Sequence, residues 1–512
     1  MRIAAILVGA GCYALALPPF DHAWLAWLAP VPLLLVVRET SRARAFGYGL
    51  LFGCAASASV TWWAVQAMGR YFGLGLPLAI LAALAIYVVV AVPTFAVFAT
   101  GASIVLSRAR RWTTPVVIGA LWVAAEIVRA RLIRQPWGLL GYTQHAQIGL
   151  LQAAALGGVY AVSFLVALGG AALADALAVL RRERSPRRAL EPLAGPAAFI
   201  AVCWAAGSAV AYLGPTGGFG GHEVAIVQTN VPPAYHWTRA YTQRQILAHL
   251  RATAALPGHP RLVVWPENSV PRYLDSEPLL AAQLARLATR RHADILVGGP
   301  RWEDGHVYNS ARLFTKDGHD GGHYDKRELV RFAEERPFGH HLADALAESP
   351  TEFTPGTSGG VLTSFVRLGV TICHEIVYPE LVHRAVGEGA ELLVNVSNDG
   401  WLDGGSGVAS RQHFAMAAFR AVEARRYLVR AATTGVSGMI DPYGRVLAAL
   451  PPGATGVLVV PVAGRRTLTP YVHLGDAFAF LCVALAGSSF VPRWAGVEWR
   501  RRAAPFPVQT AS

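Results

Sequence analysis

Cysteine is scarce in this sequence, and so are charged residues. Only five of the 512 residues are cysteine, and four of these (Cys12, Cys54, Cys203 and Cys482) lie inside long apolar segments. Cys373 is the single cysteine of the more polar half, which excludes a disulfide within that half. Charged residues make up 15% of the chain and hydrophobic residues 54%, a balance that excludes a purely soluble protein. We expect a membrane protein that is long enough for two domains.

Sequence signatures for common ligands are also missing. No glycine motif of the P-loop or dinucleotide-binding kind occurs. The histidine pairs His319/His323 and His340/His341 have no carboxylate or cysteine partner at ligand spacing. The net charge of +13 would suit a nucleic acid, but the arginines cluster in short loops between apolar runs and are not interleaved with aromatic residues. We therefore expect no cofactor, no metal ion and no nucleic-acid partner.

Eight apolar segments are present, and each is a candidate membrane span. They cover residues 3–18, 23–37, 47–68, 74–106, 115–128, 148–180, 193–213 and 473–491. The first resembles a signal peptide with a cleavage site at residues 14–16, but further spans follow at once, so we interpret it as a span. Two segments exceed the roughly 20 residues that a bilayer requires, which implies tilt or emergence into water.

The positions of the arginines predict the orientation. Arginines near residues 2, 38–44, 108–111 and 181–188 would lie in the cytoplasm, which places the polar half outside after seven spans. The eighth span returns a basic tail to the cytoplasm. One loop is an exception, because Arg129, Arg131 and Arg134 fall on the outer side of the membrane. This loop, which runs to Tyr142, has two interpretations: it binds lipid headgroups, or it takes part in substrate binding.

The pattern of residues changes after a glycine-rich linker at residues 214–221. Short β-rich runs then alternate with helical ones, which predicts an α/β sandwich. The predicted strands are 224–228, 262–265, 295–297, 307–314, 361–362, 366–372, 392–396, 427–432, 438–440 and 457–462, and the predicted helices are 241–256, 278–289, 379–386 and 408–424. The predicted organisation is a membrane domain with about seven spans (1–213), the linker, an α/β domain (222–466), a C-terminal span (467–491) and a cytoplasmic tail (492–512).

Two of the predicted strands end at residues that can do chemistry. Cys373 follows one apolar strand, and a lone thiol there is either a packing residue or a nucleophile that requires a base and an anion stabiliser. Glu267 follows a second strand, and Lys326 stands in a polar run before an apolar turn. Taken singly, Glu267 would be interpreted as a solvent-exposed residue at the end of a strand, and Lys326 as a surface residue.

In this order within one α/β domain, Glu267, Lys326 and Cys373 resemble the Glu-Lys-Cys triad of the nitrilase superfamily. Together with the apolar segments, the resemblance narrows to the apolipoprotein N-acyltransferase family and covers essentially the whole chain. It implies an α-β-β-α sandwich joined to a multi-span helical membrane domain. It also implies that Glu267 is the general base, and that Lys326 and the backbone N–H of His374 hold the oxyanion. Glu334 would orient the lysine, and Glu375 matches a family glutamate beside the nucleophile.

Other segments extend the resemblance and supply candidates for substrate binding. These are Trp237, Asn309, Asn398 and Trp401, and the pairs Gln412-His413 and Arg420-Ala421 also match the family. The chain departs from the family at three positions. His374 replaces a tyrosine, and Arg331 and Ala333 replace proline and glycine. We expect these departures to affect substrate preference and pH behaviour rather than the type of reaction.

The resemblance implies a two-step reaction at the outer face of the cell inner membrane. Cys373 would take an acyl chain from a phospholipid as a thioester and pass it to the α-amino group of the S-diacylglyceryl cysteine that begins an apolipoprotein. We expect the protein to work as a monomer surrounded by membrane lipid. Three alternatives remain: a membrane-anchored amidase for a small soluble substrate, a transporter with a solute-binding outer domain, and an inactive module that binds lipoproteins.

Overall fold

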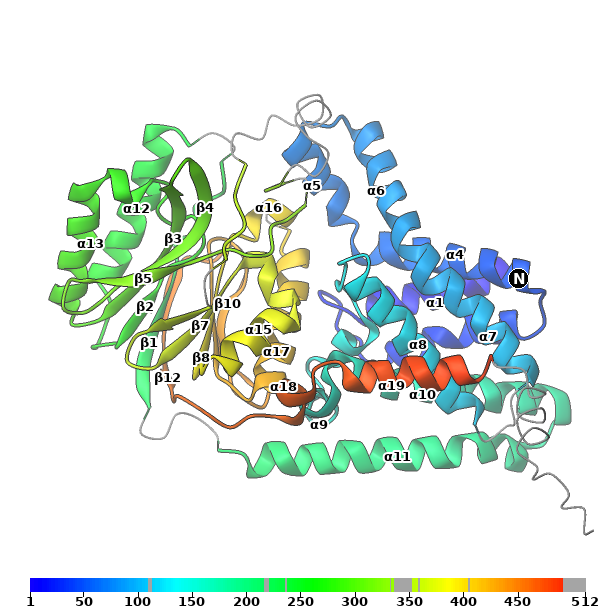
Figure 1. The fold of residues 1–512 in the computed structure, drawn as a ribbon. Coiled ribbons are helices and arrows are strands. Elements are labelled where there is room, and N and C mark those ends of the chain that lie inside the picture. Colours follow the sequence, from blue (N-terminus) through cyan, green and yellow to red (C-terminus); the bar gives the residue numbers. More distant parts are fainter. Residues whose placement is uncertain are drawn as a thin grey trace, which may run out of the picture.

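The N-terminal half is a bundle of apolar helices, shown in blue to teal in Figure 1. The computed structural model describes residues 1–108, 113–215, 221–234, 237–331, 333–335, 352–357, 360–403 and 406–490. The bundle consists of α1 (Arg2–Leu15), α2 (Leu25–Leu28), α3 (Pro30–Val37), α4 (Arg42–Val60), α5 (Trp63–Phe72), α6 (Leu76–Ala91), α7 (Val97–Arg108), α8 (Thr114–Arg131), η2 (Leu140–Gln144), α9 (Ile148–Leu151), α10 (Ala154–Glu183) and α11 (Pro186–Leu213).

Three stretches of helix within the described ranges are long and apolar enough to cross a membrane: Leu76–Ser107, Ala154–Glu183 and Pro186–Leu213. A fourth candidate is the pair α4 and α5, which is bent by 66° at a short break. The remaining predicted spans correspond to shorter apolar helices or to α8, which carries the buried charged residues Glu126 and Arg129. Between α6 and α7, Pro93 lacks an N–H, and the helix continues there through a π-helical turn, η1 (Val92–Ala96).

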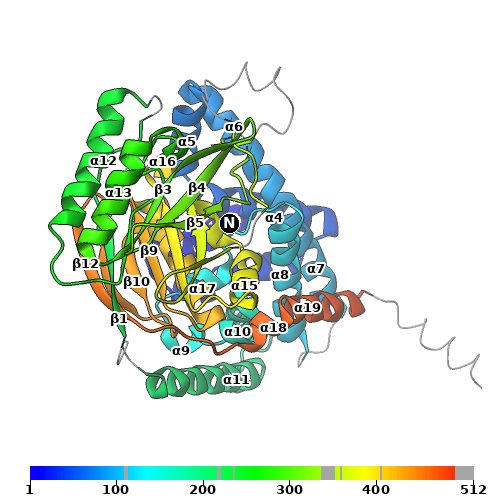
Figure 2. The ribbon, with the colours of Figure 1, turned by 60° about the vertical axis from the view of Figure 1, so that its left-hand side comes forward.

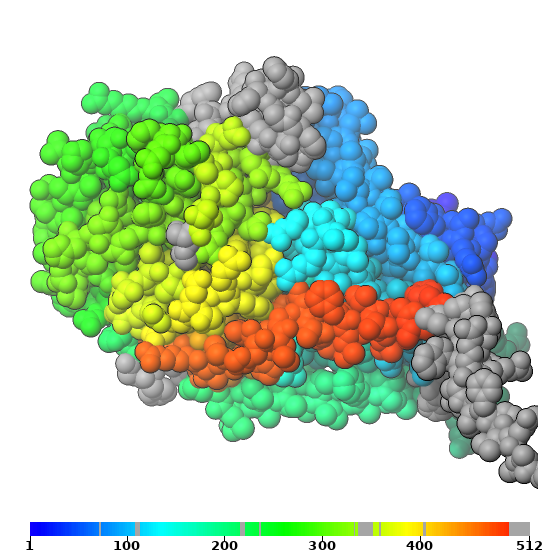
Figure 3. All heavy atoms as spheres, viewed as in Figure 1, coloured from blue at the N-terminus to red at the C-terminus, as the bar shows by residue number. Residues whose placement is uncertain are grey.

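The C-terminal segment returns to the bundle. Its helices α18 (Pro470–Leu474) and α19 (Ala477–Ser488) pack against α8 and α10, and Figure 3 shows them as an orange-red band across the bundle surface. The contact with α10 depends on a kink at Gly158, where φ is +66° and a Cβ would lie 2.4 Å from the Tyr471 ring. Only glycine permits this approach, because any side chain would be strained and would overlap the ring.

The C-terminal half contains two six-stranded sheets. The strand order is β12-β1-β2-β3-β4-β5 in one sheet and β11-β10-β9-β8-β7-β6 in the other. Their bounds are β1 His222–Gln228, β2 Leu262–Val264, β3 Asp294–Glu303, β4 His306–Phe314, β5 Asp320–Asp325, β6 Val361–Thr363, β7 Arg367–Ile372, β8 Leu392–Ser397, β9 Leu428–Ala432, β10 Ser437–Ile440, β11 Val446–Leu450 and β12 Gly456–Val462. The central strands are parallel and buried on both faces, which explains their continuous apolar sequences.

Helices cover the outer faces of both sheets (Figures 1 and 2). Helices α12 (Arg239–Ala254) and α13 (Pro278–Arg291) lie on the first sheet, and α15 (Pro379–Gly387) and α17 (Val408–Ala424) lie on the second. Short helical segments complete the connections: η3 (Leu274–Ser276), η4 (Cys373–Val377) and α16 (Gly400–Asp403). The predicted α-β-β-α sandwich is confirmed. Residues of α15 and α17 share one apolar core with the helical bundle, so this helical layer also joins the two halves.

Every predicted strand and helix of this half is present, but two strands lie where none was predicted. The sequence of β5, Asp-Gly-Gly-His-Tyr-Asp, is polar and glycine-rich, and it forms a strand because it pairs with β4 at the edge of the sheet. Strand β11 is likewise an edge strand with exposed residues. Edge strands lack the buried apolar pattern that sequence analysis depends on.

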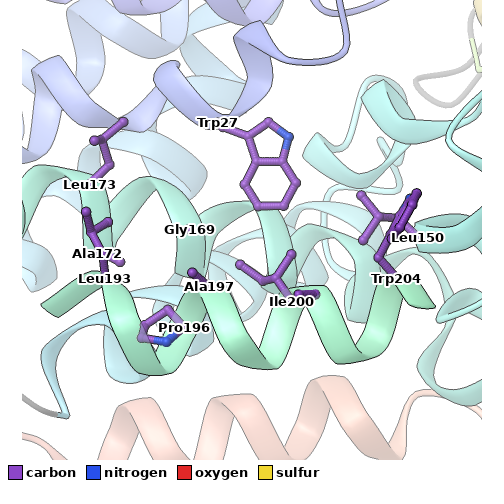
Figure 4. Close-up of a pocket in the computed structure, with 11 residues that line it drawn as sticks. Trp27, Leu150, Gly169, Ala172, Leu173, Leu193, Pro196, Ala197, Ile200 and Trp204 are labelled. Carbon is purple, nitrogen blue, oxygen red and sulfur yellow. The ribbon is translucent and has the colours of Figure 1, made fainter. Parts of the chain in front are cut away.

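A hollow of about 450 Å³ lies between α10 and α11. Figure 4 shows its lining, which is almost wholly apolar and includes Trp27, Leu173, Ile200 and Trp204. It contains no titratable side chain and belongs to two of the candidate spans. Its lining therefore offers no group for acid–base or nucleophilic chemistry.

Candidate active site

Glu267, Lys326 and Cys373 meet where strands of the two sheets end. Glu267 lies just beyond β2, Lys326 follows β5 directly, and Cys373 follows β7. The ammonium of Lys326 lies 3.4 Å from Glu267 Oε1, and the thiol of Cys373 interacts electrostatically with both groups. All three side chains are nearly buried. The fold therefore brings the predicted triad together from three separate stretches of sequence.

The backbone at Cys373 turns sharply. Its φ is +52°, in the left-handed region that costs strain for any residue with a Cβ. Asn395 on the neighbouring strand β8 holds the turn, because its Nδ2 donates to the Thr371 and Cys373 carbonyl oxygens at 3.3 and 3.2 Å. Strain that neighbouring contacts maintain in this way is typical of a functional residue.

Burial raises the pKa of the Cys373 thiol to about 12, and the Glu267 carboxylate adds to the rise while Lys326 opposes it. The thiol is therefore protonated at neutral pH and needs a base before it can attack. Burial alone would lower the pKa of Lys326, but the carboxylates of Glu334 and Glu267 outweigh that effect and raise it. The site thus holds a neutral thiol beside a permanent ammonium ion.

Glu267 is fixed by hydrogen bonds that leave it aimed into the site. Its Oε1 accepts from Asn309 Nδ2 at 2.7 Å, and its Oε2 accepts from the backbone N–H of Asn398 at 2.8 Å. Glu334 Oε1 accepts from Lys326 Nζ at 2.8 Å and from Asn309 Nδ2 at 3.0 Å. Asn309 therefore links the two carboxylates that flank the lysine.

Glu375 has a different position from Glu267 and Glu334. It is fully buried and accepts hydrogen bonds from Tyr324 Oη at 2.8 Å, from Arg327 N at 2.7 Å and from Ile372 N at 2.7 Å. Burial raises its pKa to about 7, although these hydrogen bonds oppose the rise. Because its partners flank both Lys326 and Cys373, Glu375 ties together the two segments that carry them.

Two family models match the chain. One, described as carbon-nitrogen hydrolase, matches residues 223–471, and the other, described as apolipoprotein N-acyltransferase N-terminal domain, matches residues 9–172. The apolipoprotein N-acyltransferase of Geobacter metallireducens is 32% identical over 503 residues, which cover 96% of this chain and 94% of that protein. The chain belongs to the apolipoprotein N-acyltransferase family.

Two further proteins are similar to this chain. The apolipoprotein N-acyltransferase of Azotobacter vinelandii is 33% identical over 97% of this chain and 95% of its own length. The solved structure of a nitrilase-superfamily amidase from Nesterenkonia AN1 is 20% identical, with a TM-score of 0.40, and covers 52% of this chain and 98% of that one. Membership confirms the resemblance found in the sequence and makes the chain an N-acyltransferase of lipoprotein maturation.

His374, the residue after Cys373, behaves as an uncharged aromatic ring. It stacks on Trp137, with ring centroids 6.0 Å apart and planes inclined by 11°. Tyr378 Oη lies 3.4 Å from its Nε2. Burial, reinforced by nearby His413, Lys326 and Arg134, lowers the pKa of His374 to about 3. His374 therefore does not titrate near neutral pH.

The loop that carries Arg129, Arg131 and Arg134 contacts the C-terminal half. Arg134 forms ion pairs with Glu328 and Glu380, and Arg131 with Glu380 and Asp476. The carboxylates of the chain itself thus neutralise these arginines, which argues against the interpretation that the loop binds lipid headgroups. Trp137 of the same loop lies beside the nucleophile turn through its contact with His374.

A second polar network behind Cys373 was not predicted. Asp399 accepts hydrogen bonds from Ser397 Oγ, Arg430 and His413, each between 2.7 and 3.1 Å. Arg430 and His413 hold the pKa of Asp399 below its usual range despite burial, and burial lowers the pKa of His413 to about 4. The Ser397 hydroxyl also opposes the rise in the pKa of the Cys373 thiol. The signals of this network in the sequence were an arginine inside the apolar strand β9 and His413 of the Gln412-His413 pair.

The substrate candidates fall into two groups. Asn309 and the backbone of Asn398 bond directly to Glu267, and both side chains are buried. Trp401 is half-buried on α16, and Trp237 is 36% exposed in the segment before α12. Arg331 is an exposed residue that lies 3.7 Å from Glu335, and Ala333 follows it. His340 and His341 lie outside the described residues, within which no cluster of three metal-ligating side chains occurs.

Proposed function

We propose that the family's acyl transfer proceeds in this chain through a thioester on Cys373, with Glu267 as the general base and Lys326 as the oxyanion stabiliser. The single observation that carries the proposal is the buried thiol of Cys373 beside the carboxylate of Glu267 and the ammonium ion of Lys326, which lie 3.4 Å apart. A thiol in this state attacks only if a base removes its proton, and Glu267 is held by Asn309 and Asn398 to do so.

In the first half-reaction, Glu267 takes the Sγ proton as sulfur attacks the ester carbonyl carbon of a phospholipid. The Lys326 ammonium and the backbone N–H of His374 stabilise the negative oxygen of the tetrahedral intermediate. The intermediate collapses, the C–O bond breaks, and Glu267 returns the proton to the departing lysophospholipid. The acyl chain remains on sulfur as a thioester.

In the second half-reaction, the α-amino group of a diacylglyceryl apolipoprotein attacks the thioester. Glu267 removes a proton from the attacking nitrogen, the C–S bond breaks, and Cys373 regains its proton. The side-chain amide of Asn398 supports a place for a polar substrate group, because both its Nδ2 and its Oδ1 are buried without hydrogen-bond partners in the described part of the chain. Each such atom costs about 1–3 kcal/mol unless a substrate satisfies it.

The thioester predicts a direct measurement. Purified protein incubated with phospholipid vesicles and no amine acceptor should carry one fatty acyl mass on the Cys373 peptide, detected by mass spectrometry. Lysophospholipid should appear in equal amount, because a ping-pong reaction releases its first product before the second substrate binds. Acylation that requires the acceptor to be present would exclude the acyl-enzyme.

We further propose that the protein is a monomer in the cell inner membrane, with residues 1–213 and 467–491 in the bilayer and residues 222–466 outside. Arginine-rich loops support this orientation, including the loop between α10 and α11. A reporter enzyme fused near residue 218 should be active only if it works outside the cytoplasm, and one fused near residue 186 only if it works inside. The reverse pattern would overturn the orientation and the access to lipoproteins that it provides.

A further inference from the structure

The side chain of Gln412 joins the catalytic half to four points of the helical bundle. It lies near the start of α17 and is 4% exposed. Its Nε2 donates to the carbonyl oxygens of Pro18 at 3.0 Å and Val60 at 2.9 Å. Its Oε1 accepts from the indole N–H groups of Trp137 at 2.8 Å and Trp63 at 3.3 Å. A glutamine amide has two donors and two principal acceptor sites, so this one is saturated and can point only one way.

Two of these partners flank the bend between α4 and α5. Val60 is the last residue of α4, and Trp63 is the first residue of α5, which leaves at 66°. The last carbonyl groups of a helix have no partner within it, and Gln412 supplies one to Val60. The amide therefore binds the broken candidate span on both sides of its break.

A third partner leads to the nucleophile. Trp137 stacks on His374, the residue that follows Cys373, and its ring also lies 5.4 Å from that of His413. His413 follows Gln412 and bonds Asp399 of the network behind the thiol. One turn of α17 thus contacts the bend in the bundle through Gln412 and the catalytic network through His413.

We infer that Gln412 is a positioning residue, which holds the bend of α4 and α5 and the indole of Trp137 in register with Cys373. The inference rests on the proposed function. It adds that the contacts of Gln412 align an acyl ester that arrives from the bilayer with the thiol of Cys373. A shift of about 1 Å between the two halves is enough to slow such a reaction by up to 10²-fold. A small ester that diffuses in from water does not need this alignment.

The chain offers a matched control in Gln152. Gln152 is 5% exposed and also joins the two halves, because its Nε2 donates to Ile148 O at 3.0 Å and to Tyr443 O at 2.9 Å. Its Oε1 accepts from Arg425. These hydrogen-bond partners include neither Trp137 nor His374 nor a residue of the α4–α5 bend. Gln152→Met therefore removes an interface amide of the same kind at a place remote from Cys373.

The test compares acylation of Cys373 by two donors, in Gln412→Met, Gln152→Met and the unmutated protein reconstituted in bilayers. The donors are phosphatidylethanolamine of the vesicle and water-soluble p-nitrophenyl butyrate. Gln412→Met should lower the rate with phospholipid by about tenfold or more, whereas the rate with the soluble ester should stay within about threefold of the unmutated value. Gln152→Met should leave the ratio of the two rates unchanged. An unchanged ratio in Gln412→Met, or an equal change in both variants, would overturn the inference.

Gln412→Glu provides a second variant if Gln412→Met does not fold. The carboxylate still accepts hydrogen bonds from both indoles but cannot donate to Pro18 and Val60. The ratio of the rate with phospholipid to the rate with the soluble ester should therefore fall in this variant too. Failure of both variants to fold, with Gln152→Met intact, would make Gln412 a structural residue and contradict a positioning role. Alkylation of Cys373 by N-hexadecylmaleimide relative to iodoacetamide, located by peptide mass spectrometry, measures the same alignment without catalysis. The alkylation ratio therefore tests Gln412 even if the unmutated protein forms no acyl-enzyme and the proposed function fails.

Discussion

Cys373→Ser is expected to abolish acyl transfer while the protein stays folded in the membrane. A serine hydroxyl is far less acidic than a thiol, and the carboxylate of Glu267 is too weak a base to activate it. The surroundings that already raise the pKa of the thiol to about 12 would disfavour an alkoxide still more. Turnover of phospholipid and acceptor should fall to the background rate, as measured by mass spectrometry of the lipoprotein product.

Cys203→Ser is the matched control for this variant. Cys203 is a half-buried cysteine within α11, away from the strand ends, and its replacement should leave turnover unchanged. Residual acyl transfer by Cys373→Ser above that of a protein-free sample would remove Cys373 from the role of nucleophile. Loss of activity in both variants would point instead to a general effect of serine on folding.

Glu267→Gln is expected to stop formation of the thioester itself. The amide preserves the size of the side chain, but it cannot take the Sγ proton, so the thiol remains neutral. A rapid-mixing assay with phospholipid and no acceptor should show a burst of lysophospholipid from the unmutated protein and none from this variant. A normal burst from Glu267→Gln would show that another group is the base.

Variants of Lys326 and Glu334, measured in the same assay, distinguish the general base from the residues that give electrostatic support. Lys326→Met should slow both half-reactions, by roughly 10²–10³-fold for the loss of one oxyanion donor. Glu334→Gln should be milder, because Glu334 contacts the lysine and Asn309, while Glu267 keeps its own partners. Equal losses in Glu334→Gln and Glu267→Gln would contradict this division of roles.

Two members of the proposed triad, Glu267 and Cys373, could be located in the sequence by local rules. Glu267 and Cys373 follow apolar strands, and such strands are recognisable when both faces are buried. Lys326 was found through the family pattern, since β5 before it has no strand signal and forms only by pairing with β4. The carboxyl end of that strand could not be placed from local sequence.

Contacts between distant segments of the chain could not be predicted from the sequence. The four partners of Gln412 come from residues 18, 60, 63 and 137, and nothing in their spacing predicts that they converge. The network of Asp399, His413 and Arg430 is similar, because its members lie on three different elements. Polar groups of this kind are fixed by tertiary packing, which also allows Glu126 and Arg129 to lie buried in α8.

The pairing of β12 with β1 has a consequence for how the protein is made. The last strand of the sandwich, Gly456–Val462, completes the sheet beside the first, and α19 then packs against α8 and α10. A nascent chain that has not yet reached residue 456 therefore presents the open edge of β1 and an uncovered apolar helix face at the same time. Both are features that cellular quality control recognises in incomplete proteins. Translation of the final tenth of the chain removes both features, so a molecule that stalls or is truncated there is exposed to capture although Cys373 has already been translated.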